Sequence, residues 1–94
     1  MRVYQISYDL RKQRNYDALY ERIKTYPWCH VLESNWVITT QQSAEQVRDN
    51  LAQVMDQDDG LLVTRLSGEA AWRKLNYHDQ VSRWLKEKLE AITV

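Results

Sequence analysis

The chain opens with alternating apolar and polar positions over residues 3–10. The apolar positions fall on one face of an extended segment, and the polar ones, ending in Asp9, fall on the other. The apolar face carries Tyr4, Ile6 and Tyr8. This period of two predicts a half-buried β-strand with a carboxylate at its C-terminal end.

Two later segments carry the helical period instead. From Asn15, which suits an N-cap, apolar residues recur every three or four positions as far as Tyr26, and Pro27 ends the pattern. Ser43 and Gln46 have the spacing of a capping box. The helix that they open, which ends in the acidic turn 56–60, has these inward positions: Ala44, Val47, Leu51, Val54 and Met55.

The remaining segments complete the predicted set of elements. Three further short strands are expected, at residues 29–33, 36–40 and 61–66. The first two are joined by a tight turn at Ser34 and Asn35, and Gly68 breaks the chain after the last. A final helix from about Asp79 has an apolar side made of Val81, Trp84, Leu85, Leu89 and Ile92.

The predicted order, β-α-β-β-α-β plus a C-terminal helix, is typical of an α+β ferredoxin-like fold. We expect one domain over residues 1–94, with a core at about 1–67 and a helical extension at about 69–92. Two helices on one face of a four-stranded sheet leave the other face bare. We therefore expect the C-terminal helix, or a second subunit of a symmetric dimer, to cover that face.

Net charge is zero, but the charge is unevenly distributed. Residues 1–30 hold six Lys or Arg against three Asp or Glu, whereas residues 31–60 hold one against six. A protein that coats nucleic acid is usually basic overall, so a nucleic-acid site here would be a local patch. The sequence shows neither a membrane-length apolar run nor a signal-peptide pattern, and Cys29 is its only cysteine, so we expect a cytoplasmic protein without a membrane partner.

Candidate chemistry lies where the first strand ends. A carboxylate at Asp9 can hold a divalent cation such as Mg²⁺, and the basic side chains just after it can neutralise phosphates. Those basic side chains are Arg11, Lys12 and Arg14. The alternative is that Asp9 caps the turn after the strand and that the basic loop is an ordinary solvated surface.

Other polar and aromatic residues also have two interpretations. The hydroxyl of Ser34 can donate to a phosphate or to a metal-bound water, or it can serve as a turn residue, which we favour. Tyr8, Trp36 and Trp72 can stack on bases, but aromatic rings at alternating strand positions more often lie in a core or dimer interface. Trp84 belongs to the buried stripe of the last helix.

Several short motifs resemble known families. The strand ending Tyr-Asp at residue 9, the order of elements and the Ser-Asn-Trp turn at 34–36 resemble the small CRISPR-associated adaptation nuclease and its virulence-associated protein D-like relatives. Nearly the whole chain resembles the SinR-like proteins of phages and bacteria. These share the Tyr-Asp-Leu opening, the Leu-Glu-Ser-x-Trp segment at 32–36 and the Ala-Ala-Trp at 70–72.

The resemblance implies a ferredoxin-like homodimer in which two Asp9 carboxylates share one Mg²⁺ and cleave a phosphodiester bond. Three features depart from the nuclease pattern: Leu32 stands where that family prefers Gln, Asn35 where it prefers Val, and the chain is neutral. We therefore favour a non-catalytic or weakly active dimer that associates with nucleic acid or with a protein partner. The alternative is a metal-dependent endonuclease acting on RNA or DNA.

Overall fold

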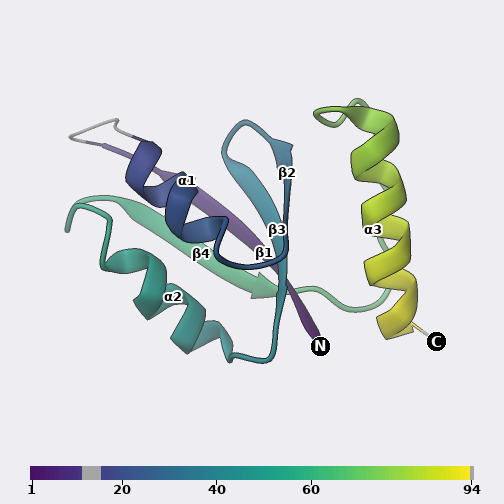
Figure 1. The fold of residues 1–94 in the computed structure, drawn as a ribbon, viewed down its shortest axis with the longest axis horizontal. Coiled ribbons are helices and arrows are strands. Elements are labelled where there is room, and N and C mark those ends of the chain that lie inside the picture. Colours follow the sequence, from purple (N-terminus) through teal and green to yellow (C-terminus); the bar gives the residue numbers. More distant parts are fainter. Residues whose placement is uncertain (12–15, 94) are drawn as a thin grey trace.

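A computed structural model describes the backbone of residues 1–11 and 16–93 and the side chains of residues 1–11 and 16–89 (Figure 1). One antiparallel sheet has the strand order β2-β3-β1-β4. Its strands are β1 (Arg2–Asp9), β2 (Trp28–Leu32), β3 (Asn35–Thr40) and β4 (Gly60–Arg65). The helices are α1 (Asp17–Ile23), α2 (Ala44–Ala52) and α3 (His78–Thr93). This is the predicted ferredoxin-like α+β fold with an added C-terminal helix.

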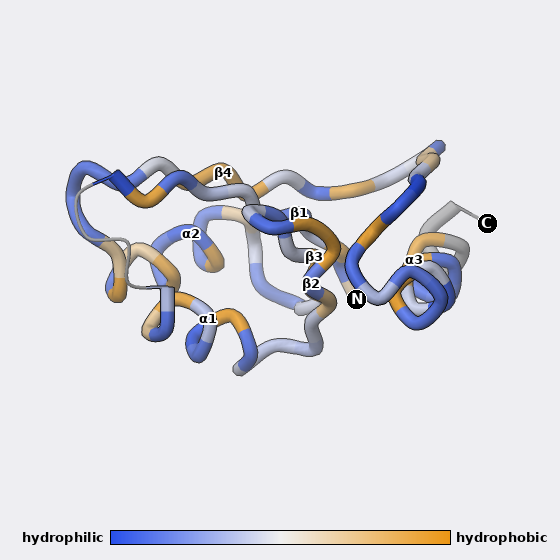
Figure 2. Tube along the Cα trace, turned by 90° about the horizontal axis from the view of Figure 1, so that it is seen from above, coloured by the Kyte–Doolittle hydropathy of each residue, from blue (hydrophilic) through white to orange (hydrophobic). Residues whose placement is uncertain are grey.

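The face of the sheet toward α1 and α2 holds the larger apolar cluster. Tyr4, Ile6 and Tyr8 of β1 lie in it, as their alternation predicts. Figure 2 shows α1 and α2 together on one side of the strands. The other buried members are Leu10, Leu19, Ile23, Tyr26, Trp36, Ile38, Val47 and Leu51. Because this cluster joins β1, β3 and both helices, it fixes the end of β1 where the candidate chemistry lies.

The opposite face of the sheet is partly covered by α3 of the same chain, one of the two arrangements that the sequence allowed. In Figure 1, α3 stands beside β2, away from α1 and α2. The buried cluster beneath it comprises Val3, Cys29, Val31, Val37, Val81, Leu85 and Leu89. Trp72 and Trp84 pack against this cluster, and the Trp72 indole N–H donates to the Ser82 hydroxyl at 3.0 Å.

The first helix is shorter than its apolar stripe predicts. Tyr16 stands at its N-cap position, and the expected cap, Asn15, lies outside the described residues. The helix ends at Ile23 rather than near Tyr26, because the Thr25 hydroxyl donates to the carbonyl of the last turn at 2.7 Å. A tighter turn, with the Tyr26 N–H donating to the Ile23 carbonyl at 3.0 Å, then leads into the proline.

The second helix begins as predicted and ends earlier. Ser43 and Gln46 form the full capping box, each side chain accepting from the other's backbone N–H at 3.2 and 2.8 Å. The helix ends at Ala52, and Val54 and Met55 pack against the core from the turn that follows. Among the helices of the described chain, none combines the length and the apolar character needed to cross a membrane.

Candidate functional site

Asp9 is the last residue of β1 and lies at the rim of the sheet, opposite Gly60 of β4. Its side chain is 73% exposed, and its carboxylate accepts a hydrogen bond from the Arg11 Nε at 3.3 Å. The alternation of β1 places it on the face away from α1 and α2. We call Asp9, Arg11 and Gly60 the β1 rim.

Arg11 is tied to the loop between α2 and β4. Its backbone N–H donates to the Asp59 carboxylate at 2.9 Å, and its Nη1 donates to the Asp58 carbonyl at 3.1 Å. The guanidinium therefore lies across the rim, between the end of β1 and an acidic loop. In this position it forms an exposed ion pair with the Asp9 carboxylate, and its Nη1 is bonded to a carbonyl of the same chain.

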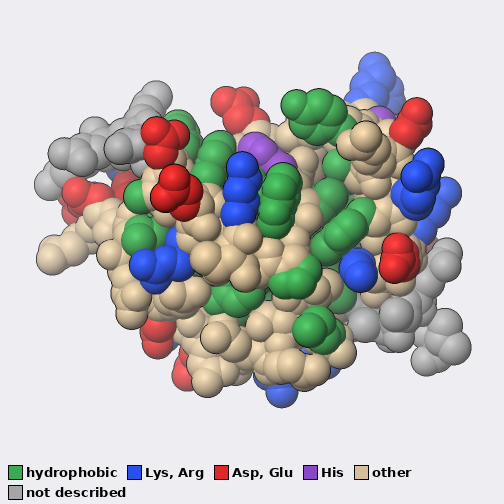
Figure 3. Space-filling view, viewed as in Figure 1, with side chains coloured by type: hydrophobic (Ala, Val, Ile, Leu, Met, Phe, Trp, Pro, Cys, Tyr) green, Lys and Arg blue, Asp and Glu red, His purple; other side chains and the backbone are tan. Residues whose placement is uncertain are grey.

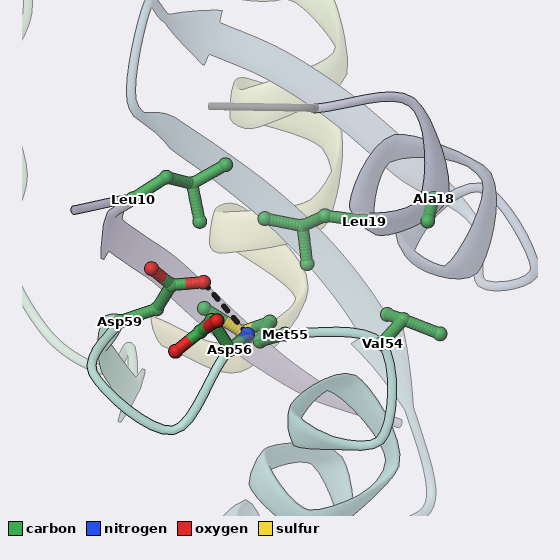
Figure 4. A pocket seen from close by; sticks show the side chains of 7 residues that line it. All are labelled: Leu10, Ala18, Leu19, Val54, Met55, Asp56 and Asp59. Atoms are coloured by element: carbon green, nitrogen blue, oxygen red, sulfur yellow. Dashed lines mark hydrogen bonds between the residues drawn. The ribbon is translucent and has the colours of Figure 1, made fainter. Parts of the chain in front are cut away.

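The same loop is held by its own aspartates. The Asp56 N–H donates to the Asp59 carboxylate at 2.8 Å, and the Asp58 N–H donates to the Asp56 carboxylate at 3.0 Å. Figure 4 shows Asp56 and Asp59 at the rim of a cavity of about 300 Å³ whose other labelled side chains are apolar. Side-chain-to-backbone bonds of this kind stabilise turns, so these carboxylates have a structural use.

The structure describes only some of the predicted phosphate-binding residues, and those lie at the same end of the sheet as Asp9. Ser34 sits in the β2–β3 turn, where its carbonyl accepts from the Tyr8 N–H at 3.3 Å, so it lies at the same end of the sheet as Asp9. Lys12 and Arg14 lie outside the described residues. The described chain therefore brings Asp9, Arg11 and Ser34 to one end of the sheet.

The described residues contribute one carboxylate, that of Asp9, to the candidate magnesium site. Within residues 1–11 and 16–89, no three His, Cys, Asp or Glu side chains are arranged to hold a metal ion. Asp9 brings one carboxylate, and the Arg11 guanidinium is its neighbour. Mg²⁺ usually takes one or two protein carboxylates, with water and phosphate oxygens as its other ligands, so the shared-ion hypothesis draws its second carboxylate from the Asp9 of a second copy.

Two of the predicted stacking residues lie in the core. Trp36 is 1% exposed and Tyr8 is 6% exposed, so neither ring is open to a base. The Trp36 indole N–H donates to the Tyr8 hydroxyl at 3.2 Å, and that hydroxyl donates to the Glu33 carbonyl at 3.1 Å. Burial, followed by the hydrogen bond to Tyr20, raises the pKa of the Tyr8 phenol above its ordinary value.

The open part of the second sheet face lies beside the β1 rim. The Asn35 side-chain oxygen accepts from both Gln5, at 3.0 Å, and the Ser7 hydroxyl. Leu62, which pairs with Ser7 across the sheet, is 62% exposed. This small polar cluster with an exposed leucine is the part of the face that α3 leaves uncovered.

A second concavity, which sequence reasoning missed, lies between β2 and the start of α3. It has a volume of about 490 Å³. We call it the aromatic groove, and its principal residues are Lys24, Trp28, His30, Trp36, Tyr77 and Trp84. Alternation in β2 was the available signal, because it puts Trp28 and His30 on the face opposite Cys29; the contribution of α3 has no local signature.

Comparison with known proteins shows the class of fold. No family model matches the sequence, and no curated protein matches it. The crystal structure of a hypothetical protein, TT1823 from Thermus thermophilus, is similar, with a TM-score of 0.63 and 19% sequence identity over 80% of this chain and 94% of that chain. At this identity the likeness shows the fold alone. The resemblance to SinR-like proteins and to adaptation nucleases therefore stays a prediction.

Proposed function

We propose that this protein is a non-catalytic binding module, assembled as a homodimer and associated with nucleic acid, in which Asp9 has a structural role. The observation that carries the proposal is the position of Arg11. A cation that serves a nuclease must meet the phosphate, but Arg11 bonds Asp9 and the Asp58 carbonyl within its own chain.

The charges around the rim support the same conclusion. Besides Asp9, the neighbouring loop contributes Asp59, whose carboxylate accepts from the Arg11 backbone. Within the described residues, the β1 rim and Asp59 together hold two carboxylates and one guanidinium group. Negative charges that are not neutralised by a metal repel phosphates and slow the approach of a nucleic acid.

The homodimer in this proposal would use the uncovered part of the second sheet face. Leu62 is one of the few large apolar side chains of the described chain that is well exposed, and it borders Ser7 and Asn35. A second copy docked there would cover Leu62 and complete the layer that α3 begins. Leu62→Lys is expected to shift the protein toward monomer in analytical ultracentrifugation.

A nuclease assay tests the non-catalytic proposal. Wild-type protein is incubated with single-stranded and duplex DNA and RNA in Mg²⁺ or Mn²⁺, beside Asp9→Asn and the control Asp79→Asn. Asp79 is an exposed carboxylate in the first turn of α3 and does not belong to the rim. We expect no metal-dependent cleavage by any of the three proteins. Cleavage by the wild type and Asp79→Asn that Asp9→Asn lacks would refute the proposal.

The second candidate is the endonuclease in which two Asp9 carboxylates hold one Mg²⁺. It is favoured by the 73% exposure of the Asp9 side chain and by Gly60, which adds no side chain to the rim. It requires the two carboxylates to face each other in the dimer. The separation of the two Asp9 side chains in a dimer structure decides this point, because a shared ion needs both within direct coordination distance.

A further inference from the structure

The floor of the aromatic groove is a fixed stack of two rings. His30 lies parallel to Trp36, with ring centroids 4.0 Å apart and an interplanar angle of 7°. The His30 ring nitrogen Nε2 lies 3.1 Å from the Glu33 carbonyl, and the Trp36 indole N–H is bonded to Tyr8. Because bonds and burial hold both rings, the floor is formed before any ligand arrives.

Trp28 forms the outer wall of the groove. It is 42% exposed, although it is a large aromatic side chain, and its ring centroid lies 5.2 Å from that of Trp36. The Lys24 ammonium lies 5.1 Å from the Trp28 ring centroid, within the range of a cation–π contact. The ammonium therefore lies over the exposed Trp28 ring, and a base that stacks on that ring would displace the ammonium toward its own phosphate.

The opposite wall of the groove lies at the N-terminal end of α3, where one residue has an unusual backbone conformation. Tyr77 has φ +45°, in the left-handed region that a bulky residue rarely adopts, and its side chain is 81% exposed. Its carbonyl accepts from the Val81 N–H at 3.1 Å, so it begins the helix. The Tyr77 side chain lines the groove from this end of the helix.

Charge around the groove selects an anion. Of the described residues that line it, Lys24 carries the formal charge, His30 is titratable, and none is a carboxylate. The Lys88 ammonium lies 5.8 Å from the Trp84 ring centroid, but it is also 3.8 Å from the Glu87 carboxylate, so Lys24 is the cation that the groove offers among the described residues. Figure 3 shows hydrophobic side chains gathered over the region between β2 and α3, with Lys or Arg and His among them. The volume of about 490 Å³ is within the range of small-molecule pockets, roughly 300–1,000 Å³.

An extended peptide fits the groove less well than a flat ring does. β2 is an edge strand, and peptides often bind such edges by adding a strand. Here the Asn76 N–H donates to the Val31 carbonyl at 3.0 Å, and the Asn76 side chain donates to the His30 carbonyl at 3.4 Å. The segment before α3 thus already uses the backbone acceptors of β2 that a peptide would need.

We infer that the aromatic groove binds a nucleobase with its phosphate, as in a single-stranded nucleic acid, by stacking on Trp28 and by pairing the phosphate with Lys24. The base then lies between β2 and Tyr77, the residue directly before α3. This inference rests on the proposed function, since it names the ligand class that the binding module takes. Aromatic stacking tolerates any base, so the groove needs no sequence preference.

Fluorescence anisotropy with short labelled oligothymidylate and oligouridylate strands tests this inference on the full-length protein. We expect Trp28→Ala to weaken binding by about tenfold or more, and Trp28→Phe to keep most of it, because phenylalanine retains a stacking face. Lys24→Gln is expected to weaken binding and to flatten its salt dependence by about one phosphate contact. Lys86→Gln, an equal charge change at an exposed α3 position, serves as the control.

Each outcome decides the inference. Tighter binding of the strand than of the mononucleotides AMP and UMP supports a polynucleotide ligand, and equal binding supports a free nucleotide. Absence of binding to both, or binding that Trp28→Ala leaves unchanged, overturns the inference. So does binding of an acidic, tyrosine-containing peptide at Trp28 without binding of the strand. Cleavage that depends on Asp9 would refute the proposed function alone, because it is read in a separate assay.

Discussion

The β1 rim and the aromatic groove lie at different places on one sheet and differ in how their charges are used. At the rim, Arg11 is bonded to carboxylates and carbonyls of its own chain. In the groove, the Lys24 ammonium lies over an aromatic ring, without a carboxylate among the described lining residues. A cation already neutralised by its neighbours has little left for a ligand, whereas a cation over a ring can still pair with a phosphate.

The two regions also differ in how visible they are in the sequence. Asp9 and Arg11 of the rim belong to a contiguous acidic and basic motif, so they attract a functional interpretation. The groove is assembled from α1, β2, β3 and α3, and no short segment contains it. If the groove is the binding site that we propose, exposed aromatic surface is a better guide to it in this chain than contiguous charge is.

The largest expected effect is on the free energy of unfolding, and it distinguishes the buried floor of the groove from its exposed wall. Trp36→Ala removes a fully buried ring and should lower the free energy of unfolding by about 3–5 kcal/mol. Trp28→Ala removes a ring that is 42% exposed and should cost about 1 kcal/mol or less. Urea unfolding followed by circular dichroism measures both. Similar losses for the two variants would show that the groove wall is part of the core.

A smaller effect concerns the buried hydroxyl that links the floor to β1. Tyr8→Phe leaves the Trp36 indole N–H without its partner, and we expect a loss of about 1–3 kcal/mol near neutral pH. Urea unfolding of both proteins gives the difference. A loss near zero would mean that the hydroxyl network does not stabilise the strand.

The pH dependence of stability, compared between the wild type and Tyr8→Phe, gives a second test of the same hydroxyl. The pKa of the Tyr8 phenol is raised in the folded protein by burial, so above about pH 10 the unfolded chain releases this proton while the folded chain keeps it. Stability therefore falls as pH rises through this range, by about 1.4 kcal/mol per pH unit for this group. Tyr8→Phe lacks this loss, so the difference between the two proteins should shrink in alkali. A constant difference would contradict the raised pKa.

The smallest expected effect is at the rim. Arg11→Ala should change stability by about 1 kcal/mol or less, because its ion pair with Asp9 is exposed. Gly60→Ala makes a matched perturbation, since the added Cβ would lie 3.0 Å from the Arg11 Nη2 and displace the guanidinium. If the guanidinium lies across Gly60, the loss of unfolding free energy in the double variant Arg11→Ala/Gly60→Ala should be smaller than the sum of the losses in the two single variants. Strict additivity would show that Arg11 does not cross the rim.

Local patterns predicted the fold because each element follows from short-range rules. The alternation of β1 placed Tyr4, Ile6 and Tyr8 on the helix-covered face, and the capping box fixed the start of α2. Helix ends were less predictable. At the end of α1, the N–H and the hydroxyl of Thr25 both donate to the Arg22 carbonyl in a tighter turn, which an apolar stripe does not reveal.

The candidate site was harder to predict, because it depends on contacts between distant segments. Asp9 and Ser34 lie at one end of the sheet, although they are far apart in the sequence. The bond from Arg11 to the loop before β4 joins residues 47 or more positions apart, and the Tyr77 wall meets Trp28 only after α3 has folded back on the sheet. Neither arrangement follows from local hydrophobic or charge patterns.

The return of α3 to its own sheet has a consequence for hydrogen exchange. The helix covers Val3 and Val37, and its first turns also complete the groove through Tyr77 and Trp84. Opening of α3 alone would expose part of the sheet and remove one wall of the groove in the same event. A ligand in the groove should therefore slow amide exchange throughout α3, even in turns that do not touch it, so the helix would report occupancy as a single cooperative unit.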